Sequence, residues 1–357
     1  MSLFFFSSSC NSLMSFTVIS SKRAFIAAST ITLLLFFSLL SSLYSSISDK
    51  KCSSNHILPL SISLSPKPSL IDFNQITASA DAKRNKEKIL VLTPLKDAAG
   101  YLDRYFELLD RTRYPNHLIS IAFLVSDSSD GTLELLEYHA RRLQRRWSNR
   151  FESIRIFQKD FDFDLPNEKR HRYEMQPLRR RVMARSRNWL LSASLRHDIS
   201  WVAWVDVDVV EYPPTIFEDL IRADVDVIVP NCLLSRQDHA FWAYDKNNWQ
   251  ETDASRFRQR DLDEEFVLLE GYYEFPTYRY LMVDMPTDVS PDYKVPLDGV
   301  GATFTLVKAN VHREGAIFPA FTYQHQVETE GFAKIAKSMG FGVYGLPGYI
   351  IYHVQND

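Results

Sequence analysis

The stretch WVAWVDVDVVEY, residues 201–212, decides how the rest of the chain is interpreted. Its first half is apolar enough for a strand that is buried on both faces, yet Asp206 and Asp208 follow one residue apart. Burying a carboxylate is costly unless a partner compensates its charge. Two interpretations follow: the strand ends at Asp206 and both acids are solvated, or a cation lies beside them.

The first 85 residues differ in composition from the remainder of the 357-residue chain. No charged side chain precedes Lys22, and residues 24–44 form an uncharged run of about the 20 residues that a helix needs to cross a hydrocarbon core. This run is long for the core of a signal peptide, so we expect an uncleaved anchor, with a cleaved signal as the alternative. The expected order is a cytoplasmic tail (1–23), a transmembrane anchor (24–44), a Ser- and Pro-rich stem (45–85) and a lumenal folded domain (86–357).

Overall charge and cysteine content limit the classes of function. The net charge is -3 and the pI is near 6.3, whereas nucleic-acid binders are normally basic, so we expect no nucleic-acid partner. The three cysteines, Cys10, Cys52 and Cys232, form no zinc pattern with histidines. We expect Cys232 to be a buried thiol, with a disulfide to Cys52 as the alternative.

Apolar runs and helical repeats alternate along residues 86–357. This alternation predicts an α/β domain, with a mostly parallel sheet flanked by helices on both faces. In such open sheets ligands bind at the carboxyl ends of the strands. The expected strands are 88–97, 119–132 with its terminal turn, 153–160, 201–210, 225–231 and a last one ending at His353, and the expected helices are 101–112, 133–147, 175–197 and 327–340.

The Asp206–Asp208 pair lies at one of these expected strand ends. In a continuous strand the two side chains share a face, about 6.5 Å apart. Mg²⁺ or Mn²⁺ can then bridge carboxylate and phosphate oxygens. The tripeptide alone is a weak signal, but the buried strand before it and the turn at Pro213-Pro214 favour a metal site.

An arginine-rich helix precedes this strand. Arg180, Ala184 and Arg187 recur at i, i+4 and i+7, which places them on one helix face. Guanidinium groups suit phosphate recognition, so we expect Arg180 and Arg187 to contact a diphosphate beside the metal. The alternative is a solvated basic face or arginines that pair with acids.

Several segments, taken in order, resemble a known family. They are ILVLTPLKD (89–97), FLVSDSSDGT (123–132), RRRVMARSRNWLL (179–191), WVAWVDVDVV (201–210) and VETEGFAKIAKSMGFGVYGLPGYIIYH (327–353). Together they resemble the Golgi mannosyltransferase subunits of the fungal mannan polymerase complexes, in glycosyltransferase family 62, over nearly all of 86–357. The resemblance implies the GT-A nucleotide-sugar transferase fold and a type II Golgi membrane protein that works in a hetero-oligomeric complex.

The same resemblance implies a reaction. The donor would be GDP-mannose, the metal Mn²⁺ (or Mg²⁺), and the acceptor a mannan or an N-glycan outer chain, with retaining, α-1,6-type transfer. Asp206 and Asp208 would form the metal and donor motif, and His353 would be a further metal ligand, for which a neutral imidazole is suitable. A core or capping histidine is the alternative for His353.

Residues at two other strand ends would bind the nucleoside. Thr93 and Pro94 lie where the base pocket is expected, with Thr93 lining it. Asp127 would accept hydrogen bonds from the guanine or the ribose. The context SDSSDG also suits a simple turn former, so that role for Asp127 stays open.

Three acids are candidates for the acceptor side. Glu328 and Glu330 open a helix that faces the acceptor mannose in the resemblance, although acids there are also favoured by the helix dipole alone. Asp298 is another candidate for contact with the acceptor hydroxyl. Retaining transferases need no strong enzymatic base where the leaving diphosphate takes the acceptor proton, and metal and arginines then stabilise the departing charge.

Two other functions remain open on the sequence. The same fold could use another nucleotide-sugar, because the loops that choose base and sugar cannot be interpreted from local sequence. The chain could also be a non-catalytic structural subunit of a glycosyltransferase complex.

Overall fold

The computed structural model describes residues 69–166, 172–235 and 242–355, and its folded unit begins at Leu70. The expected tail and anchor and most of the expected stem lie outside the described residues, as do Cys10 and Cys52. Within the described ranges, no helix is long and apolar enough to cross a membrane. The end of the expected stem packs into the folded unit, because Ala82 is fully buried and Thr77 hydrogen-bonds to Glu87.

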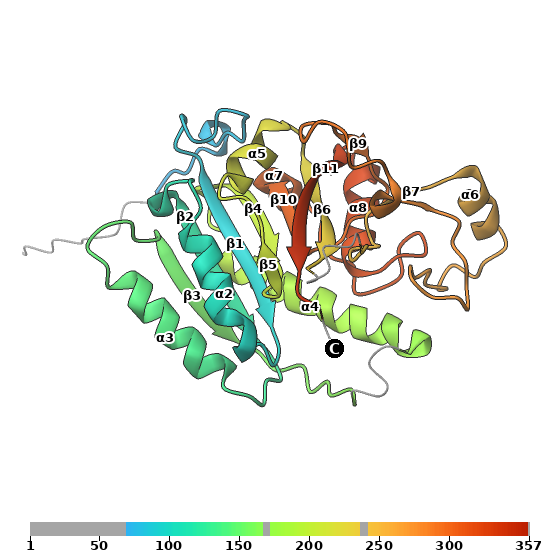
Figure 1. Cartoon of the computed structure of the whole chain (residues 1–357), viewed down its shortest axis with the longest axis horizontal. Coiled ribbons are helices and arrows are strands. Elements are labelled where there is room, and N and C mark those ends of the chain that lie inside the picture. Colours follow the sequence, from blue (N-terminus) through green and yellow to red (C-terminus); the bar gives the residue numbers. More distant parts are fainter. Residues whose placement is uncertain (1–68, 167–171, 236–241, 356–357) are drawn as a thin grey trace, which may run out of the picture. The chain divides into compact units, whose positions relative to one another are not determined.

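A nine-stranded sheet forms the centre of the folded unit in the described part of the chain (Figure 1). Its order is β3-β2-β1-β4-β10-β6-β11-β5, and β9 pairs with β11 off this path. The strands β7 (Trp249–Gln250) and β8 (Tyr280–Leu281) form a separate small sheet. The strands of the large sheet are β1 (Lys88–Leu95), β2 (Ile119–Val125), β3 (Ser153–Gln158), β4 (Ile199–Val205), β5 (Val209–Glu211), β6 (Val227–Leu234), β9 (Val295–Pro296), β10 (Phe304–Lys308) and β11 (Val343–His353).

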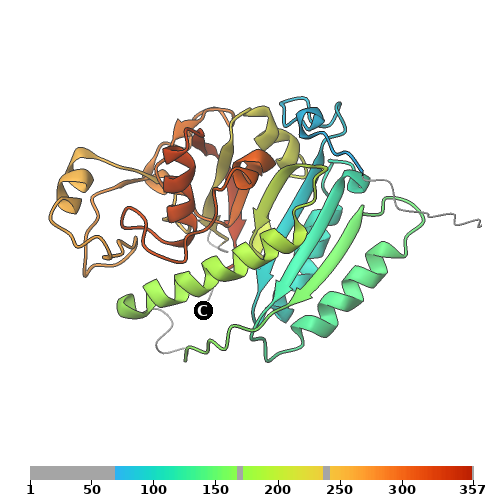
Figure 2. The same ribbon diagram turned by 180° about the vertical axis from the view of Figure 1, so that it is seen from behind.

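Helices cover both faces of this sheet, as expected from the sequence (Figures 1 and 2). The helices α2 (Ala99–Asp110), α3 (Thr132–Gln144) and α5 (Ile216–Arg222) pack on one face, and α4 (Gln176–Ser194), α7 (Ala309–Arg313) and α8 (Glu328–Ser338) pack on the other. Each face of the sheet has its own hydrophobic core, because successive side chains of a strand point to opposite faces. On β1, Ile89 and Val91 pack in the core under α2, α3 and α5. Leu90 and Leu92 pack in the core under α4, α7 and α8. The short helix α6 (Asp253–Gln259) lies beyond α8, at the end of the unit that carries β7.

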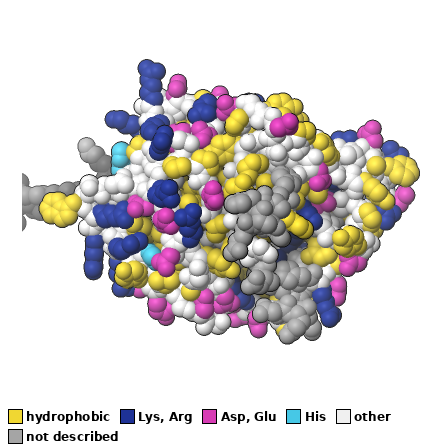
Figure 3. Space-filling model, in the orientation of Figure 1, with side chains coloured by type: hydrophobic (Ala, Val, Ile, Leu, Met, Phe, Trp, Pro, Cys, Tyr) yellow, Lys and Arg dark blue, Asp and Glu magenta, His cyan; other side chains and the backbone are white. Residues whose placement is uncertain are grey.

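Charged side chains of both signs lie on the exposed surfaces of α2 and α3. On the face shown in Figure 3, basic and acidic groups are interspersed over α2 and α3. The ion pairs Arg104–Glu107 and Arg141–Glu137 are examples from these two helices. Their i, i+3 and i, i+4 spacing is the one at which helical side chains meet.

The expectation of a mostly parallel sheet is confirmed in part, because the sheet is mixed. The pairs β1–β2, β2–β3, β1–β4 and β6–β11 are parallel, but β10 is antiparallel to both β4 and β6, and β5 and β9 are antiparallel to β11. The segment before β10 lies at the carboxyl edge of β4, where Asp206 N donates to Thr303 O. The chain therefore enters β10 from that edge and runs back between two strands of the opposite direction.

The opening stretch also folds differently from the continuous strand that its pattern predicts. The strand β4 ends at Val205, and β5 starts at Val209 and pairs with β11. Asp206 and Asp208 thus lie in the turn between two strands, and the strand spacing assumed for them does not apply. The expected buried thiol is confirmed, since Cys232 lies on β6 with no exposed surface.

Candidate active site

The turn of Asp206 and Asp208 is held at both ends by backbone hydrogen bonds. Asp206 N donates to Thr303 O next to β10 at 3.0 Å, and Val354 N donates to Asp208 O at 3.0 Å. The turn therefore lies between the end of β4 and the end of β11. This arrangement brings the C-terminal His353 to the aspartate pair, as the resemblance implied.

His353 is buried and contacts Asp208 directly. Its Nε2 lies 2.9 Å from Asp208 Oδ1, and its Nδ1 donates to Val354 O at 2.6 Å. The ring stacks on Tyr244, with centroids 3.7 Å apart and planes 15° apart. Burial acts to lower the pKa of His353, but the hydrogen bond and the negative charge of Asp208 outweigh it, so the pKa is raised.

Asp206 faces Arg187 of α4. Arg187 Nη2 lies 3.4 Å from Asp206 Oδ1, and the guanidinium lies beside the rings of Trp204 and Phe318, which pack against each other. Burial raises the pKa of Asp206, Arg187 lowers it and the neighbouring Asp208 raises it, for a net increase. Arg187 is only 2% exposed, and its Nη1 has no hydrogen-bond partner among the described residues.

Glu328 binds the same arginine from the other side. Its Oε1 lies 3.2 Å from Arg187 Nε, and the residue is 4% exposed. It opens α8 with a φ of 54°, a left-handed conformation that is strained for a residue with a Cβ. Glu328 is thus the one acceptor-side candidate that shares a charge partner with Asp206 in the described part of the chain.

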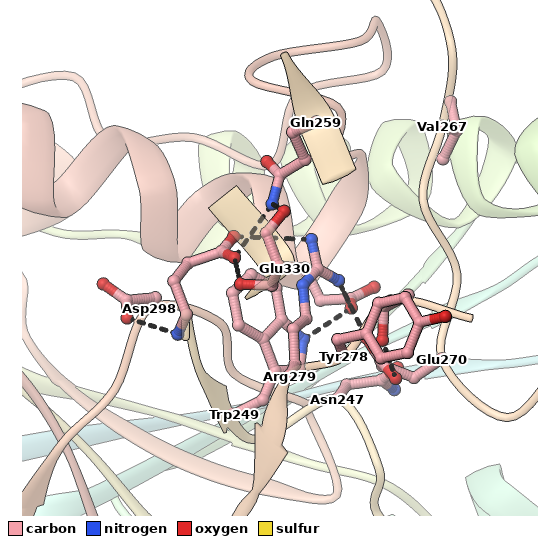
Figure 4. A network of polar contacts seen from close by, with 12 residues as sticks. Asn247, Trp249, Gln259, Val267, Glu270, Tyr278, Arg279, Asp298 and Glu330 are labelled. Carbon is pink, nitrogen blue, oxygen red and sulfur yellow. Dashed lines mark hydrogen bonds and ion pairs between the residues drawn. The ribbon is translucent and has the colours of Figure 1, made fainter. Parts of the chain in front are cut away.

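Glu330 lies in a second, adjoining network (Figure 4). Both of its oxygens are occupied, because Oε1 accepts from Trp249 Nε1 at 2.8 Å and Oε2 pairs with Arg180. Arg279 stacks on the Trp249 ring at 3.6 Å and pairs with Glu270 at 3.0 Å. This largely buried cluster joins α4, α8 and β7.

The two arginines of α4 share a face as predicted, but the face packs on α8. Arg180 pairs with Glu330 and Arg187 with Glu328, which matches the alternative that the arginines pair with acids. The predicted phosphate contact therefore stays a prediction, and it requires Arg187 to use its free Nη1 or to exchange partners.

Asp298 lies apart from the aspartate turn. One oxygen accepts from Glu251 N at 2.8 Å, and the other pairs with Lys337 of α8. Burial acts to raise the pKa of Asp298, but Lys337 and the Glu251 amide lower it further than burial raises it. No hydrogen bond or ion pair in the described residues links Asp298 to Asp206, Asp208 or His353.

The predicted nucleoside-binding residues are engaged within the protein. Thr93 is fully buried, and its hydroxyl donates to Val205 O at 2.7 Å and contacts Tyr105 OH at 2.6 Å. Pro94 follows it on β1, half-buried beside Leu124 of β2. Thr93 thus supports the end of β4 from inside the core, and base contact by Thr93 and Pro94 stays a prediction.

Asp127 holds a loop together. Its carboxylate accepts from Phe161 N at 3.1 Å and from Asp162 N at 3.0 Å, while its own backbone has a φ of 46°. These contacts match the turn-former alternative. A contact of Asp127 with guanine or ribose stays a prediction.

The chemistry of Asp206, Asp208 and His353 fits a divalent cation, although their arrangement is not that of a metal site. Among the described residues, no group of three His, Cys, Asp or Glu side chains is placed to hold a metal ion. The donor set of two carboxylates and one imidazole nevertheless suits Mn²⁺. His353 Nδ1 is bound to a carbonyl, as in metal-bound histidines, so Nε2, which contacts Asp208 in this structure, is the nitrogen that would bind a cation.

Comparison with known proteins identifies the family. A family model described as Anp1 matches residues 68–322. The chain belongs to the Anp1 family.

Relatives of this Anp1 chain include yeast proteins that are named as subunits of mannan polymerase complexes. It is 43% identical over 279 residues to the mannan polymerase II complex anp1 subunit of Schizosaccharomyces pombe, covering 75% of this chain and 64% of that relative. It is 40% identical to the mannan polymerase complex subunit mnn9 of the same yeast, covering 80% and 85%. It is 38% identical to the mannan polymerase II complex ANP1 subunit of Saccharomyces cerevisiae, covering 81% and 59%. The chain thus spans less than two thirds of the two Anp1 subunits.

Solved structures similar to this Anp1 chain share little sequence with it. Mannosyltransferase PcManGT from Pyrobaculum calidifontis, in complex with GDP-Man and Mn²⁺, has a TM-score of 0.41 and 12% identity, covering 74% of this chain and 56% of that one. GalNAc-T7 with UDP, GalNAc and Mn²⁺ has a TM-score of 0.43 and 10% identity, covering 76% and 44%.

Sequence reasoning on this Anp1 chain missed Tyr244, Trp249 and Arg279. Each contacts a predicted site residue or its partner, but the three lie in the irregular region after residue 235, where no periodicity marks them. The only local signal was the richness of that region in Tyr and Trp.

Proposed function

We propose that this Anp1-family chain is a metal-dependent mannosyltransferase. It transfers mannose from GDP-mannose, with retention and α-1,6-type linkage, to a mannan or an N-glycan outer chain. It acts in a hetero-oligomeric mannan polymerase complex, anchored by residues 24–44 in the Golgi membrane with the GT-A domain in the lumen. The names of the yeast relatives support the complex and its product.

One observation carries this proposal. The aspartate turn, His353 and Arg187 come from the end of β4, the end of β11 and helix α4, and they meet at the carboxyl end of β4. A structural core has little use for two carboxylates in a half-buried turn, whereas a diphosphate site needs such groups. Asp206, Asp208 and His353 would hold the cation, which supplies positive charge to the departing diphosphate.

The remaining charged residues have different parts in the proposal. Arg187 offers its free Nη1 to the diphosphate while its Nη2 keeps Asp206 in place. Glu328 is favoured as the acceptor-side acid, because Glu330 has both oxygens occupied and Asp298 is paired with Lys337. Since Oε1 of Glu328 is held by Arg187, Oε2 is the atom that would face an acceptor hydroxyl.

The test is sugar transfer by the purified full chain, alone and with its partner subunits. GDP-mannose is compared with other GDP- and UDP-sugars, with Mn²⁺, with Mg²⁺ and after metal removal by EDTA. We expect transfer from GDP-mannose only, lost in EDTA and restored by Mn²⁺. Asp206→Asn and Asp208→Asn should reduce kcat by at least about 100-fold, whereas Asp292→Asn, an exposed residue paired with Arg222, should not.

A second candidate is a non-catalytic structural subunit of such a complex. The observation that favours it is that the charged groups of the site pair with one another, Asp206 with Arg187 and Asp208 with His353. In that case a complex that contains the Asp206→Asn variant would transfer mannose as fast as the wild-type complex. That result would remove the catalytic proposal.

A further inference from the structure

One loop contacts both His353 and the charge network beside the candidate site. We call residues 244–249 the anchoring loop, and it begins where Tyr244 stacks on His353. Asn247 Oδ1 accepts from Arg180 Nη2 at 3.1 Å, and Trp249 at the end of the loop donates to Glu330. The loop therefore contacts the metal-ligand candidate His353 and the charge network of α4 and α8.

Asp245 lies at the centre of this loop and is 4% exposed. Its Oδ1 accepts from Asn247 N at 3.1 Å, which closes the loop on itself. Its Oδ2 accepts from Thr303 Oγ1 at 2.9 Å. Its own backbone N donates to Cys232 O on β6 at 3.2 Å, so the loop is tied to the sheet.

Thr303 connects this carboxylate to the aspartate turn. The same residue that donates its hydroxyl to Asp245 accepts the backbone N–H of Asp206 at 3.0 Å. Two consecutive hydrogen bonds thus lead from Asp245 to the first residue of the turn. A displaced Asp245 would leave the Thr303 hydroxyl without its acceptor and loosen Thr303 where the β4–β10 pairing ends, next to the Asp206 amide.

The backbone around Asp245 is shaped to admit its carboxylate. A Cβ on Gly301 would lie only 2.0 Å from Asp245 Oδ2, so any side chain at residue 301 would expel the carboxylate. Gly301 N donates to Asn248 Oδ1 at 2.8 Å, which fixes the glycine against the anchoring loop. Burying an acid in this way has a cost, and the hydrogen bonds from Thr303 and Asn247 offset it.

We infer that Asp245 is a positioning residue that sets the geometry of the cation site. It acts through Thr303 on the Asp206 end of the site and through the anchoring loop on the His353 end. Asp245 touches neither the cation nor the substrate. This inference rests on the proposed function, because it concerns how well Asp206, Asp208 and His353 are arranged to hold a cation.

The test uses Thr303→Val in the full chain, since this change removes one hydroxyl at nearly constant volume. Mn²⁺ binding is measured by electron paramagnetic resonance, and the thermal unfolding midpoint is recorded for each variant. Removal of a group that orients metal ligands typically weakens metal binding about 10–100-fold. We expect that range for Thr303→Val and for Asp245→Ala, near-wild-type binding for Thr303→Ser, and a higher KM for Mn²⁺ in transfer.

The matched control is Thr277→Val. Thr277 is buried like Thr303 and also donates its hydroxyl to a buried carboxylate, Glu270, at 2.9 Å. It has no such link to the aspartate turn, so Thr277→Val should lower stability about as much as Thr303→Val and leave Mn²⁺ binding unchanged. Equal Mn²⁺ affinity of Thr303→Val, Thr277→Val and the wild type would overturn the inference.

A failure of the proposed function gives a different result. If the wild type itself binds no Mn²⁺, the metal dependence proposed above is lost. Hydrogen exchange of the metal-free protein then decides whether Asp245 positions the turn. We expect faster exchange over residues 201–212 in Thr303→Val than in Thr277→Val, and equal exchange would show that Asp245 has no such role.

Discussion

At the scale of single residues, Arg187 is the charge on which the site depends. It lies against both Trp204 and Phe318 and is the shared partner of Asp206 and Glu328. Sequence spacing predicted its helix face but not its partners. Glu328 lies 141 positions further along the chain, and no local pattern reports a contact at that separation.

Replacing this arginine should destabilise the fold. Arg187→Met keeps apolar bulk against the two rings but leaves two acids without their cation, and breaking a buried ion pair costs about 3–5 kcal/mol. We expect a loss of that size in the free energy of unfolding, measured by chemical denaturation. Arg185→Met, at an exposed position of the same helix, should change it by less than about 1 kcal/mol. Similar losses for both variants would show that Arg187 carries no special charge role.

At the scale of elements, α8 determines where the acceptor-side acids lie. Its first turn packs on α4, so Glu328 and Glu330 face Arg187 and Arg180. The helix can approach the segment that joins α7 to α8 because Gly331 has no side chain, and a Cβ there would lie 2.4 Å from Pro319 Cγ. A pattern of helical residues predicts such a helix but not the close contact.

A pair of glycine substitutions tests this packing. Gly331→Ala forces α8 away from Pro319, and overpacking typically costs about 1–3 kcal/mol. Gly100→Ala in α2 meets no atom within 4 Å, so it should stabilise the helix by about 0.5–1 kcal/mol. Unfolding midpoints of the two variants are compared with the wild type. A stabilised Gly331→Ala variant would contradict the contact.

At the scale of the whole folded unit, a second charge cluster ties the amino ends of the strands together. Lys88 at the start of β1 pairs with Glu152 and Asp198, which precede β3 and β4, and Arg196 pairs with both acids. Burial acts to raise the pKa of Asp198 and of Glu152, but hydrogen bonds from Arg196 and Lys88 lower both further. The cluster therefore lies at the amino ends of the strands, whereas the candidate site lies at the carboxyl end of β4.

These shifts predict how stability depends on pH. Because both acids have a lower pKa folded than unfolded, their contribution is complete above the unfolded values of about 4 and is lost as the pH falls through the folded values. We expect Asp198→Asn to be less stable than the wild type at pH 7 and the difference to shrink below about pH 4. Denaturation curves from pH 7 to pH 3 measure this, and a difference that stays constant with pH would refute it.

The local pattern of apolar and polar residues was sufficient to predict much of the fold. Residues 88–95, 119–125 and 199–205 form buried strands where apolar runs predicted them, and α4 begins within one residue of its expected start. The antiparallel β10 was not predicted, since it is a five-residue run after a long segment in which the sequence shows no clear periodicity. Its direction depends on which edge of the sheet the chain returns to, and that is a property of the whole fold.

The sequence by itself determined the two-faced sheet, a buried strand that leads into an aspartate pair and a helix face that carries two arginines. Periodicity and the cost of buried charge are local, so they can be read from neighbouring residues. Only the tertiary structure decided that Arg180 and Arg187 pair with Glu330 and Glu328, that Asp298 pairs with Lys337, and that Asp245 supports the turn through Thr303. These pairs join residues up to 150 positions apart in the sequence. Coulomb attraction and hydrogen bonding act between such residues only after the sheet has brought their side chains together.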